Sequence, residues 1–345
     1  MSKKKSRILV LGNFGYANHN LNGQTIKTRV SREMIEKYHG SDNTDYFDTQ
    51  TLENKLKIFT LLKKVCSADI VFYLPARGNL KYLLPVYFVL SKIFRFKIIY
   101  SVIGGWLVPY LKNKPLHRWM LKRIKVVLAE TELMKNELAQ EYGFKNVDVL
   151  YNFRLSDFNP TIHNHETLKL VFMARIHPLK GLNTIFALCE YIASMSPKPD
   201  ITVDFYGQLA PGITDQEFID QVNKYSFVTY HGALEPEDIN ETIHDYDLMM
   251  LPTQYFTEGL PGTIIDAYTS GLPAIVTKWR HATEFIDNWN NGIIVPFDNN
   301  QEDFITAIID LYKNRSMLNK LKIGAIKSGK QFTGEYAWEV VKKYV

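Results

Sequence analysis

Short apolar runs, rich in β-branched and aromatic residues, alternate along the chain with longer stretches whose apolar positions recur at helical spacing. In the first half this pattern predicts strands at 7–12, 69–74, 97–103, 126–129 and 147–150, with helices at 24–37, 79–94 and 131–143. Continuous apolar strands that alternate with helices are typical of a parallel sheet covered on both faces. We therefore expect a Rossmann-like, doubly wound α/β domain over residues 1–155.

A polar stretch at 154–167 separates this series from a second one of the same kind. The second pattern predicts strands at 168–174, 201–207, 227–232, 248–252 and 273–277, helices at 182–194, 214–224, 236–245 and 261–270, and helical closing segments at 301–313 and 315–345. We expect a second Rossmann-like domain over 156–330 that faces the first across a cleft. A C-terminal helix within 331–345 is expected to cross back to the first domain.

The composition is that of a folded globular protein. The 345 residues are 46% apolar and 22% charged, and Cys66 and Cys189 are the two cysteines. These values exclude a disordered chain, a disulfide-rich scaffold and a cysteine-based zinc cluster. No uncharged apolar stretch approaches about 18 residues, so we expect no membrane-spanning helix. The basic start leads into a strand rather than a signal peptide, and a cytoplasmic protein is expected.

Charge divides unevenly between the two halves. Residues 1–150 hold 25 Lys and Arg against 12 Asp and Glu, a net of +13, which leaves −8 for 151–345. Within 55–125 there are 15 basic residues and one acid, Asp69, among many apolar residues. Such a segment suits an anionic membrane surface, whereas nucleic acid is disfavoured because no nucleic-acid module is present. The alternative is a solvated basic face without a partner.

The densest chemical signal is the segment 257–277, TEGLPGTIIDAYTSGLPAIVT. Gly259, Pro261 and Gly262 precede or open a predicted helix whose first amides lack intrahelical acceptors, an arrangement that attracts a diphosphate. Glu258 and Asp266 flank these amides and suit sugar hydroxyls better than phosphate. The alternatives are a helix-start acid at Glu258 and a buried polar residue at Asp266.

Two further signals follow predicted strands. Arg175 and Lys180 lie in the loop after strand 168–174, where two cations can neutralise a diphosphate. Gly15 and Gly23 follow the first strand and permit close approach of a ligand to the backbone. Because the glycines do not form a GxGxxG pattern, a nicotinamide site is disfavoured. Surface cations and a plain loop are the alternatives.

With these motifs the chain resembles glycosyltransferase family 4, whose members have the GT-B fold and retain the anomeric configuration. The likeness runs over nearly the whole chain and is strongest in ARIHPLKG (174–181), HGALEPEDINETIHDYDLMMLPT (231–253), TEGLPGTIIDA (257–267) and GLPAIVT (271–277). The resemblance implies that Arg175 and Lys180 hold the donor diphosphate, that Glu258 contacts donor sugar hydroxyls and that Asp266 binds the ribose. It implies further donor contacts at Gly23, Gly207, Gly232, Ala233, Leu234, Gly259, Leu260, Pro261, Gly262 and Thr263.

Two departures from the family pattern stand out. Asp266 replaces the usual second glutamate, and Gly104-Gly105-Trp106 occupies the place of a common His-Gly pair. We expect the acceptor side to include Gly15, Gly104, Gly105 and Trp106. His19 and His117 are spare candidates for proton transfer, although solvated or structural roles are commoner for single histidines.

We expect no Asp-x-Asp triplet, no cluster of His, Asp and Glu with metal-ligand spacing, and no cofactor apart from the nucleoside-diphosphate sugar as co-substrate. The charge on the departing diphosphate then falls to Arg175, Lys180 and the helix N-terminus. The predicted reaction is retaining, metal-independent glycosyl transfer to a glycan or polyprenyl-diphosphate-linked acceptor in cell-surface polysaccharide biosynthesis, at the inner face of the membrane. The alternatives are a nucleotide-sugar epimerase and a non-catalytic GT-B subunit of another transferase.

Overall fold

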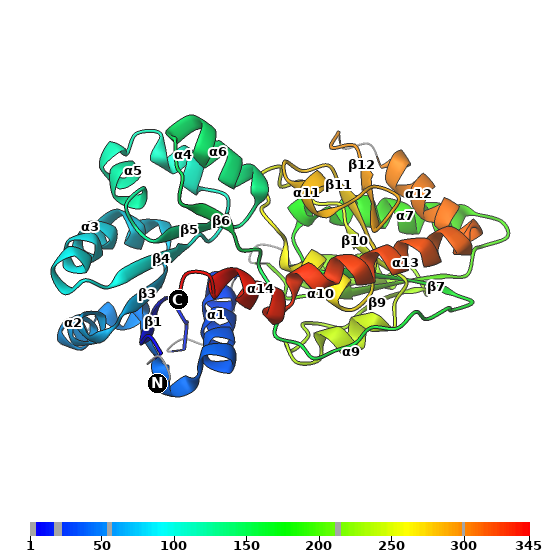
Figure 1. The fold of residues 1–345 in the computed structure, drawn as a ribbon. Helices are drawn as coiled ribbons and strands as arrows, with labels where there is room; N and C mark the ends of the chain where they lie inside the picture. The colour runs from blue at the N-terminus through cyan, green and yellow to red at the C-terminus, as the bar shows by residue number, and fades with distance from the viewer. Residues whose placement is uncertain (1–4, 17–22, 54–56, 211–214, 299–300) are drawn as a thin grey trace. The chain divides into compact units, whose positions relative to one another are not determined.

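The structure is a computed structural model, and it describes residues 5–16, 23–53, 57–210, 215–298 and 301–345. The chain divides into two compact units (Figure 1). Unit 1 comprises Met1–Ser156 together with Gln331–Val345, and unit 2 comprises Asp157–Lys330. The expected α/β fold with two parallel sheets is confirmed, whereas a cleft between the units stays a prediction.

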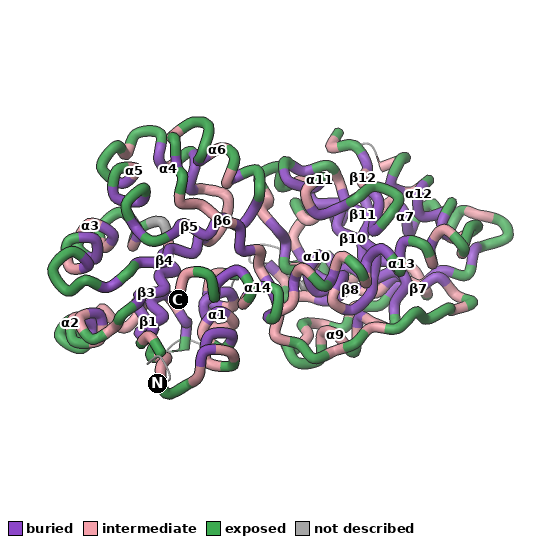
Figure 2. Tube along the Cα trace, viewed as in Figure 1, coloured by how far each residue is buried: buried purple, intermediate pink, exposed green. Residues whose placement is uncertain are grey.

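Unit 1 contains a six-stranded sheet in the order β2-β1-β3-β4-β5-β6, and every neighbouring pair is parallel. Its strands are β1 (Ile8–Gly12), β2 (Thr44–Asp48), β3 (Ile70–Leu74), β4 (Lys97–Ser101), β5 (Val126–Ala129) and β6 (Val147–Val149). Strands β1 and β3 are buried along their whole length, because helices cover both faces of the sheet. Figure 2 shows this buried centre beneath helices whose outer sides are exposed.

The helices of unit 1 are α1 (Gly23–His39), α2 (Lys57–Ser67), α3 (Arg77–Phe94), α4 (Leu107–Leu111), α5 (Pro115–Leu121), α6 (Glu132–Tyr142) and α14 (Gly334–Val341), with short 3₁₀ turns at η1 (Ser41–Asn43) and η2 (Thr49–Glu53). Apolar side chains of α2 to α6 pack on one face of the sheet, and those of α1 and α14 pack on the other. Helix α6 ends at Gly143, whose left-handed φ of 66° closes it as predicted.

The C-terminal segment belongs to unit 1. Trp338 of α14 stacks on Tyr38 of α1 with ring centroids 5.9 Å apart. The Tyr344 hydroxyl donates a hydrogen bond of 2.9 Å to the carboxylate of Asp148 in β6. These contacts join the last residues of the chain to the face that α1 covers.

Unit 2 repeats the architecture, with parallel strands in the order β12-β11-β10-β7-β8-β9. Its strands are β7 (Leu168–Met173), β8 (Ile201–Tyr206), β9 (Val228–Tyr230), β10 (Leu248–Leu251), β11 (Ala274–Thr277) and β12 (Gly292–Val295). Its helices are α7 (Leu182–Ser194), α8 (Asp215–Asn223), α9 (Ile239–His244), α10 (Gly262–Thr269), α11 (Ala282–Phe285), α12 (Glu302–Lys313) and α13 (Arg315–Gly329), with η3 (Pro178–Lys180) and η4 (Lys330–Phe332).

The order of unit 2 reverses at the β7–β10 pair, because β8 and β9 follow β7 on one side while β10, β11 and β12 lie on the other. The carboxyl ends of strands at such a reversal form the usual ligand site of an open α/β sheet. The loops after β7 and β10 are therefore the ones that the fold singles out.

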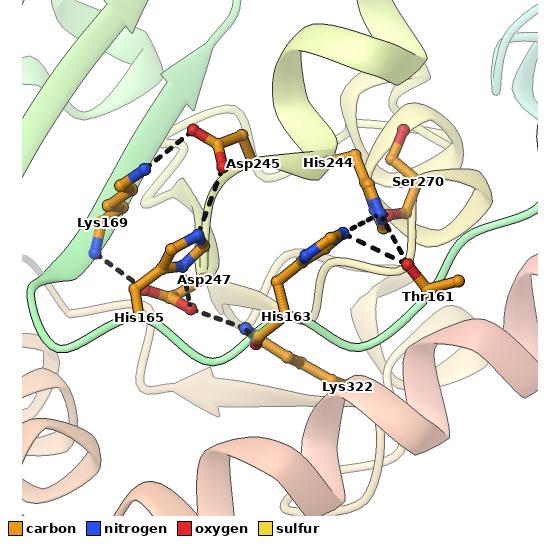
Figure 3. A network of polar contacts seen from close by, with 9 residues as sticks. All are labelled: Thr161, His163, His165, Lys169, His244, Asp245, Asp247, Ser270 and Lys322. Carbon is orange, nitrogen blue, oxygen red and sulfur yellow. Dashed lines mark hydrogen bonds and ion pairs between the residues drawn. The ribbon is translucent and has the colours of Figure 1, made fainter.

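The opposite, amino-terminal edge of this sheet holds a polar network that fixes the segment leading into β7 (Figure 3). Lys322 of α13 donates to the His163 carbonyl oxygen and to the Asp247 carboxylate, each at 2.6 Å. His163 and His244 bring their Nε2 atoms to 2.6 Å, and His165 contacts Asp247 at 3.2 Å. The network connects the segment before β7 to α9, α13 and the start of β10.

Candidate functional site

The loop after β7 carries the two predicted cations. The Arg175 side chain is exposed and has no hydrogen bond or ion pair within the described ranges, so it is free to meet an anion. Lys180 ends the short turn η3, and its ammonium lies 5.1 Å from the centroid of the Tyr255 ring. Gly181 follows with a φ of 89°, and a Cβ there would lie 2.0 Å from the Pro252 carbonyl oxygen. Only glycine lets this loop lie so close to the loop after β10.

The loop after β10 carries Glu258, which is mostly buried. The indole of Trp279, itself 1% exposed, donates a hydrogen bond of 3.2 Å to the Gly259 carbonyl oxygen. The main-chain amide of Gln254 donates a hydrogen bond of 2.8 Å to the Leu179 carbonyl oxygen. These bonds hold the loop against both neighbouring segments, so Glu258 projects from a fixed backbone.

Lys180 and Glu258 meet in a hydrogen-bonded ion pair, although 78 positions separate them in the chain. Both side chains are about four-fifths buried. The two motifs therefore lie at the same edge of the same sheet, after the adjacent strands β7 and β10, as the strand order predicts. Each charge therefore neutralises the other.

Helix α10 begins beside this pair. Its cap residue Pro261 has an extended backbone, and the amides of Gly262 and Thr263 come too early in the helix to have intrahelical acceptors. The helix dipole adds positive potential at this end. Asp266 lies one turn further on and is 5% exposed, and Leu260, just before the helix, is buried. The site thus combines one exposed cation, one paired cation and free amides.

The remaining predicted donor residues of unit 2 border the same edge. Gly207 follows β8, has a φ of 144° and places its Cα so that a Cβ would lie 1.8 Å from the Ala174 carbonyl oxygen. Its amide donates to the Gly232 carbonyl oxygen at 2.8 Å. Beyond Gly232, Ala233 is exposed and Leu234 is partly exposed. The carboxyl ends of β7, β8 and β9 are therefore drawn together by close backbone packing.

In unit 1 the structure places the predicted glycines at the carboxyl-terminal edge of the other sheet. Gly15 is buried with a φ of 64°, and its carbonyl accepts a hydrogen bond of 3.1 Å from Arg29. Gly23 is the first residue of α1 and has nothing within 4 Å of a built Cβ. The candidate His19 lies outside the described residues.

The acceptor-side candidates Gly104, Gly105 and Trp106 form the loop between β4 and α4, and all are partly exposed. His117 is buried, with its Nε2 atom 3.2 Å from the Lys81 carbonyl oxygen, so it serves the packing of α5 against α3.

A buried ion pair that the sequence analysis missed lies under this loop. Lys27 of α1 contacts Glu130 at 2.7 Å, and each side chain is 4% exposed. Burial lowers the pKa of Lys27, while the charge of Glu130 and its hydrogen bond act in the opposite direction. The two residues are 103 positions apart, so no local sequence pattern predicts the pair.

One expectation about metals needs correction. An Asp-x-Asp triplet is present, at Asp245-Tyr246-Asp247. It lies before and at the start of β10, at the edge opposite Lys180 and Glu258, and its carboxylates contact Lys169 and Lys322 (Figure 3). Across the described segments, no three His, Cys, Asp or Glu side chains gather in a way that would hold a metal ion. Metal independence itself stays a prediction.

No described helix is long and apolar enough to cross a bilayer.

Comparison with known proteins finds similarity to carbohydrate-transfer enzymes. Residues 154–328 match the family described as glycosyl transferases group 1. The chitobiosyldiphosphodolichol beta-mannosyltransferase of Debaryomyces hansenii is 23% identical over 232 residues, which cover 57% of this chain and 48% of that protein. The amylovoran biosynthesis glycosyltransferase AmsK of Erwinia amylovora is 24% identical over 140 residues, covering 38% and 33%. The chain spans less than half the length of each curated relative that it matches.

The fold has solved counterparts. HepE of Anabaena, in complex with UDP-glucose, superposes with a TM-score of 0.71 at 15% identity, and the match covers 98% of both chains. The sucrose-phosphate synthase of Thermosynechococcus elongatus gives a TM-score of 0.66 over the same shares. At this identity the likeness establishes the fold alone. The finer assignment to glycosyltransferase family 4 and the retention of configuration stay predictions. Because the match to the glycosyl transferases group 1 model covers half of the chain, the chain belongs to that family.

Proposed function

We propose that the chain transfers a glycosyl group from a nucleoside-diphosphate sugar to a hydroxyl acceptor, with retention of configuration and without a metal ion. The observation that carries the proposal is the contact between Lys180 and Glu258 beside the first amides of α10. A cation, a carboxylate and free amides at one sheet edge match the diphosphate and the hydroxyls of such a donor.

The reaction breaks the bond between the sugar C1 and a diphosphate oxygen and forms a bond from C1 to the acceptor oxygen. Negative charge grows on the departing diphosphate, where Arg175, Lys180 and the α10 amides stabilise it. Retention follows when the acceptor attacks the face that the diphosphate leaves, and a diphosphate oxygen takes the acceptor proton. Glu258 accepts hydrogen bonds from donor hydroxyls and so fixes the sugar for this attack.

Donor binding rearranges the ion pair. A diphosphate competes with Glu258 for the Lys180 ammonium, and the sugar hydroxyls then become the partners that Glu258 needs, since an unpaired buried carboxylate is costly. Asp266 is the candidate for the ribose hydroxyls, and the backbone at Gly207 and Gly232 borders the base.

We infer that the acceptor is a glycan or a polyprenyl-diphosphate-linked sugar, bound by unit 1 in the synthesis of a cell-surface polysaccharide. Two relatives support this class, since the printed name of one concerns a diphosphodolichol-linked sugar and that of the other amylovoran biosynthesis. The basic excess of residues 1–150 suits a diphosphate-bearing substrate.

Association with the inner face of the membrane is part of the proposal. On α3, Tyr82, Val86, Val89 and Ile93 recur at helical spacing and are 47–66% exposed, which marks one outward apolar stripe. Helix α3 carries basic side chains and no acid. Helices α2 and α5 cover the same sheet face and carry exposed apolar residues as well. Apolar side chains among cations are the pattern of a helix lying on anionic lipid.

Sedimentation with vesicles of phosphatidylglycerol and phosphatidylcholine tests the surface. We expect binding at low salt that weakens with added salt and with phosphatidylcholine alone. The triple variant Val86→Ser, Val89→Ser, Ile93→Ser should lose binding. A control variant that changes two exposed apolar residues of unit 2, Tyr191→Ser and Ile323→Ser, should keep it. Equal loss in both variants, or no binding by the wild-type protein, contradicts the membrane proposal.

A thermal-shift panel of nucleoside diphosphates and their sugars, with EDTA or with Mg²⁺, tests the donor. We expect stabilisation by one base in EDTA. Lys180→Gln and Arg175→Ala should each weaken binding about tenfold, or about 1.4 kcal/mol. Lys198→Gln, which removes an exposed cation from the opposite edge before β8, should leave binding unchanged. Binding that requires Mg²⁺ contradicts metal independence, and stabilisation by none of the nucleotides contradicts the donor class.

A further inference from the structure

The Lys27–Glu130 ion pair also forms hydrogen bonds to the main chain of the loop after β4. Besides its contact with Glu130, the Lys27 ammonium donates a hydrogen bond of 2.6 Å to the Val102 carbonyl oxygen. The second carboxylate oxygen of Glu130 accepts one of 2.8 Å from the Gly104 amide. Each charged side chain therefore bonds a backbone group next to Ile103, Lys27 on the side of Val102 and Glu130 on the side of Gly104.

Packing alone does not account for charges at this place. Removing two charges from water costs several kcal/mol per ion, and apolar pairs of similar size often replace buried ion pairs without loss of stability. What an apolar pair cannot replace is the pair of hydrogen bonds to Val102 and Gly104. The specific contribution of Lys27 and Glu130 is thus the orientation of the loop.

The backbone of a glycine does not by itself fix that orientation, because glycine adopts positive and negative φ about equally readily. Gly104 has a φ of 78°, in the left-handed region, and a Cβ there would lie 3.3 Å from Cδ1 of Trp106. The hydrogen bond from the Gly104 amide to Glu130 selects this conformation and sets where the partly exposed Gly105 and Trp106 lie. Lys27 also stands in the second turn of α1, which begins at Gly23, so the same contact connects the start of α1 to the loop.

We propose that Lys27 and Glu130 are positioning residues, which hold the 102–106 loop in the conformation that the acceptor requires. This role rests on the proposed function, because it assigns the loop to the acceptor. Neither side chain is exposed enough to touch substrate, so both act through the backbone of Val102 and Gly104.

The test replaces the pair by apolar side chains, Lys27→Met with Glu130→Leu, in the full chain. A matched control, Arg32→Met with Glu36→Leu, removes a partly exposed ion pair from the same helix α1. Hydrogen exchange of the peptide 101–111, the melting temperature, the affinity for nucleoside diphosphate and turnover are measured for each. The donor is the nucleotide sugar that stabilises the protein most, and the acceptor probe is a short-chain polyprenyl-diphosphate-linked sugar in vesicles.

We expect the apolar pair to keep the melting temperature within a few degrees and the nucleotide affinity within twofold. The Gly104 amide should exchange at least tenfold faster, and turnover should fall at least tenfold. The control should match the wild-type protein in all four. Wild-type exchange and turnover in the apolar pair would overturn the proposal. If that variant does not fold, Glu130→Gln is measured instead, because its side-chain amide oxygen can still accept a hydrogen bond from the Gly104 amide. In Glu130→Gln we expect slow exchange at Gly104 and partial turnover. Fast exchange at Gly104 in that variant would overturn the proposal.

Exchange is read without substrate. A wild-type protein that is inactive on the probe would therefore count against the proposed acceptor, while the exchange data would still decide whether Lys27 and Glu130 order the loop.

Discussion

Thr263 donates a hydrogen bond of 2.7 Å from its hydroxyl to the main-chain carbonyl oxygen of Met173, which ties the first turn of α10 to the carboxyl end of β7. Replacing it by the isosteric valine removes the bond and leaves the Met173 carbonyl without this partner. We expect Thr263→Val to cost about 1–2 kcal/mol of unfolding free energy and to weaken nucleotide binding several-fold. Thr263→Ser keeps the hydroxyl and should behave as the wild-type protein. Calorimetry that finds equal affinity for both variants would contradict the link.

Two glycines with left-handed backbones differ in the space around them, and this predicts different costs. At Gly207 an added Cβ meets the Ala174 carbonyl oxygen, whereas at Gly232, with a φ of 77°, nothing lies within 4 Å. Gly232→Ala should cost about 1–2 kcal/mol from the backbone alone. Gly207→Ala adds displacement of the loop that holds Arg175, so chemical denaturation should give a larger loss together with weaker nucleotide binding. Equal losses would show that the close packing at Gly207 is not needed.

The two Lys–Asp pairs of the network in Figure 3 differ in burial. The side chains of Lys322 and Asp247 are 4% and 1% exposed, whereas those of Lys169 and Asp245 are 31% and 66% exposed. Lys322→Met leaves a buried carboxylate poorly compensated and should cost about 3–5 kcal/mol. Lys169→Met should cost less than about 1 kcal/mol, because water screens that pair. Urea unfolding of the two variants measures the difference, and similar losses would contradict the assignment of buried charge.

Acid should loosen the same network through its histidines. The His244 Nδ1 atom faces the Ser270 carbonyl oxygen at 2.8 Å, and a carbonyl only accepts, so Nδ1 carries the hydrogen. The Nε2 atom of His244 can then accept from Nε2 of His163. Desolvation, aided by the neighbouring charges of His244, His165 and Lys322, lowers the pKa of His163.

The unfolded chain therefore binds a proton at His163 more readily than the folded chain does, and stability should fall as the pH drops from about 6.5 to the lowered pKa. Because His163 is well exposed, the expected change in melting temperature is small, about 1–2 °C. Melting temperatures of the wild-type protein and His163→Asn between pH 7.5 and 5 measure it, with the slope expected to flatten in the variant. Parallel curves would contradict the titration.

The parts of this molecule that were predictable are those that local patterns encode. The strand 126–129 and the helix 182–194 coincide with β5 and α7, because a continuous apolar run and helical spacing each fix an element without help from distant residues. Strand β2, with the sequence TDYFD, was not predicted, since acidic residues interrupt its pattern. Pairing with β1 decides its conformation.

The candidate site divides in the same way. Arg175, Lys180, Glu258 and the start of α10 follow strands in recognisable motifs, so strand order alone brings them to one edge. The contacts of Lys27 and Glu130 with the loop at Gly104 connect α1 to the loops after β4 and β5. These residues are far apart in the sequence, and only the folded sheet brings them together.

The most direct test of the central claim uses the substitution Glu258→Gln, which keeps the size of the side chain and removes the charge that neutralises Lys180. Titration calorimetry with the nucleoside diphosphate lacking its sugar should then find tighter binding than in the wild-type protein, about threefold or more, because Lys180 no longer has to leave an ion pair. Turnover of the corresponding nucleotide sugar should fall at least tenfold in the same variant. Unchanged or weaker binding of the diphosphate, with turnover preserved, would show that Lys180 and Glu258 do not receive the donor.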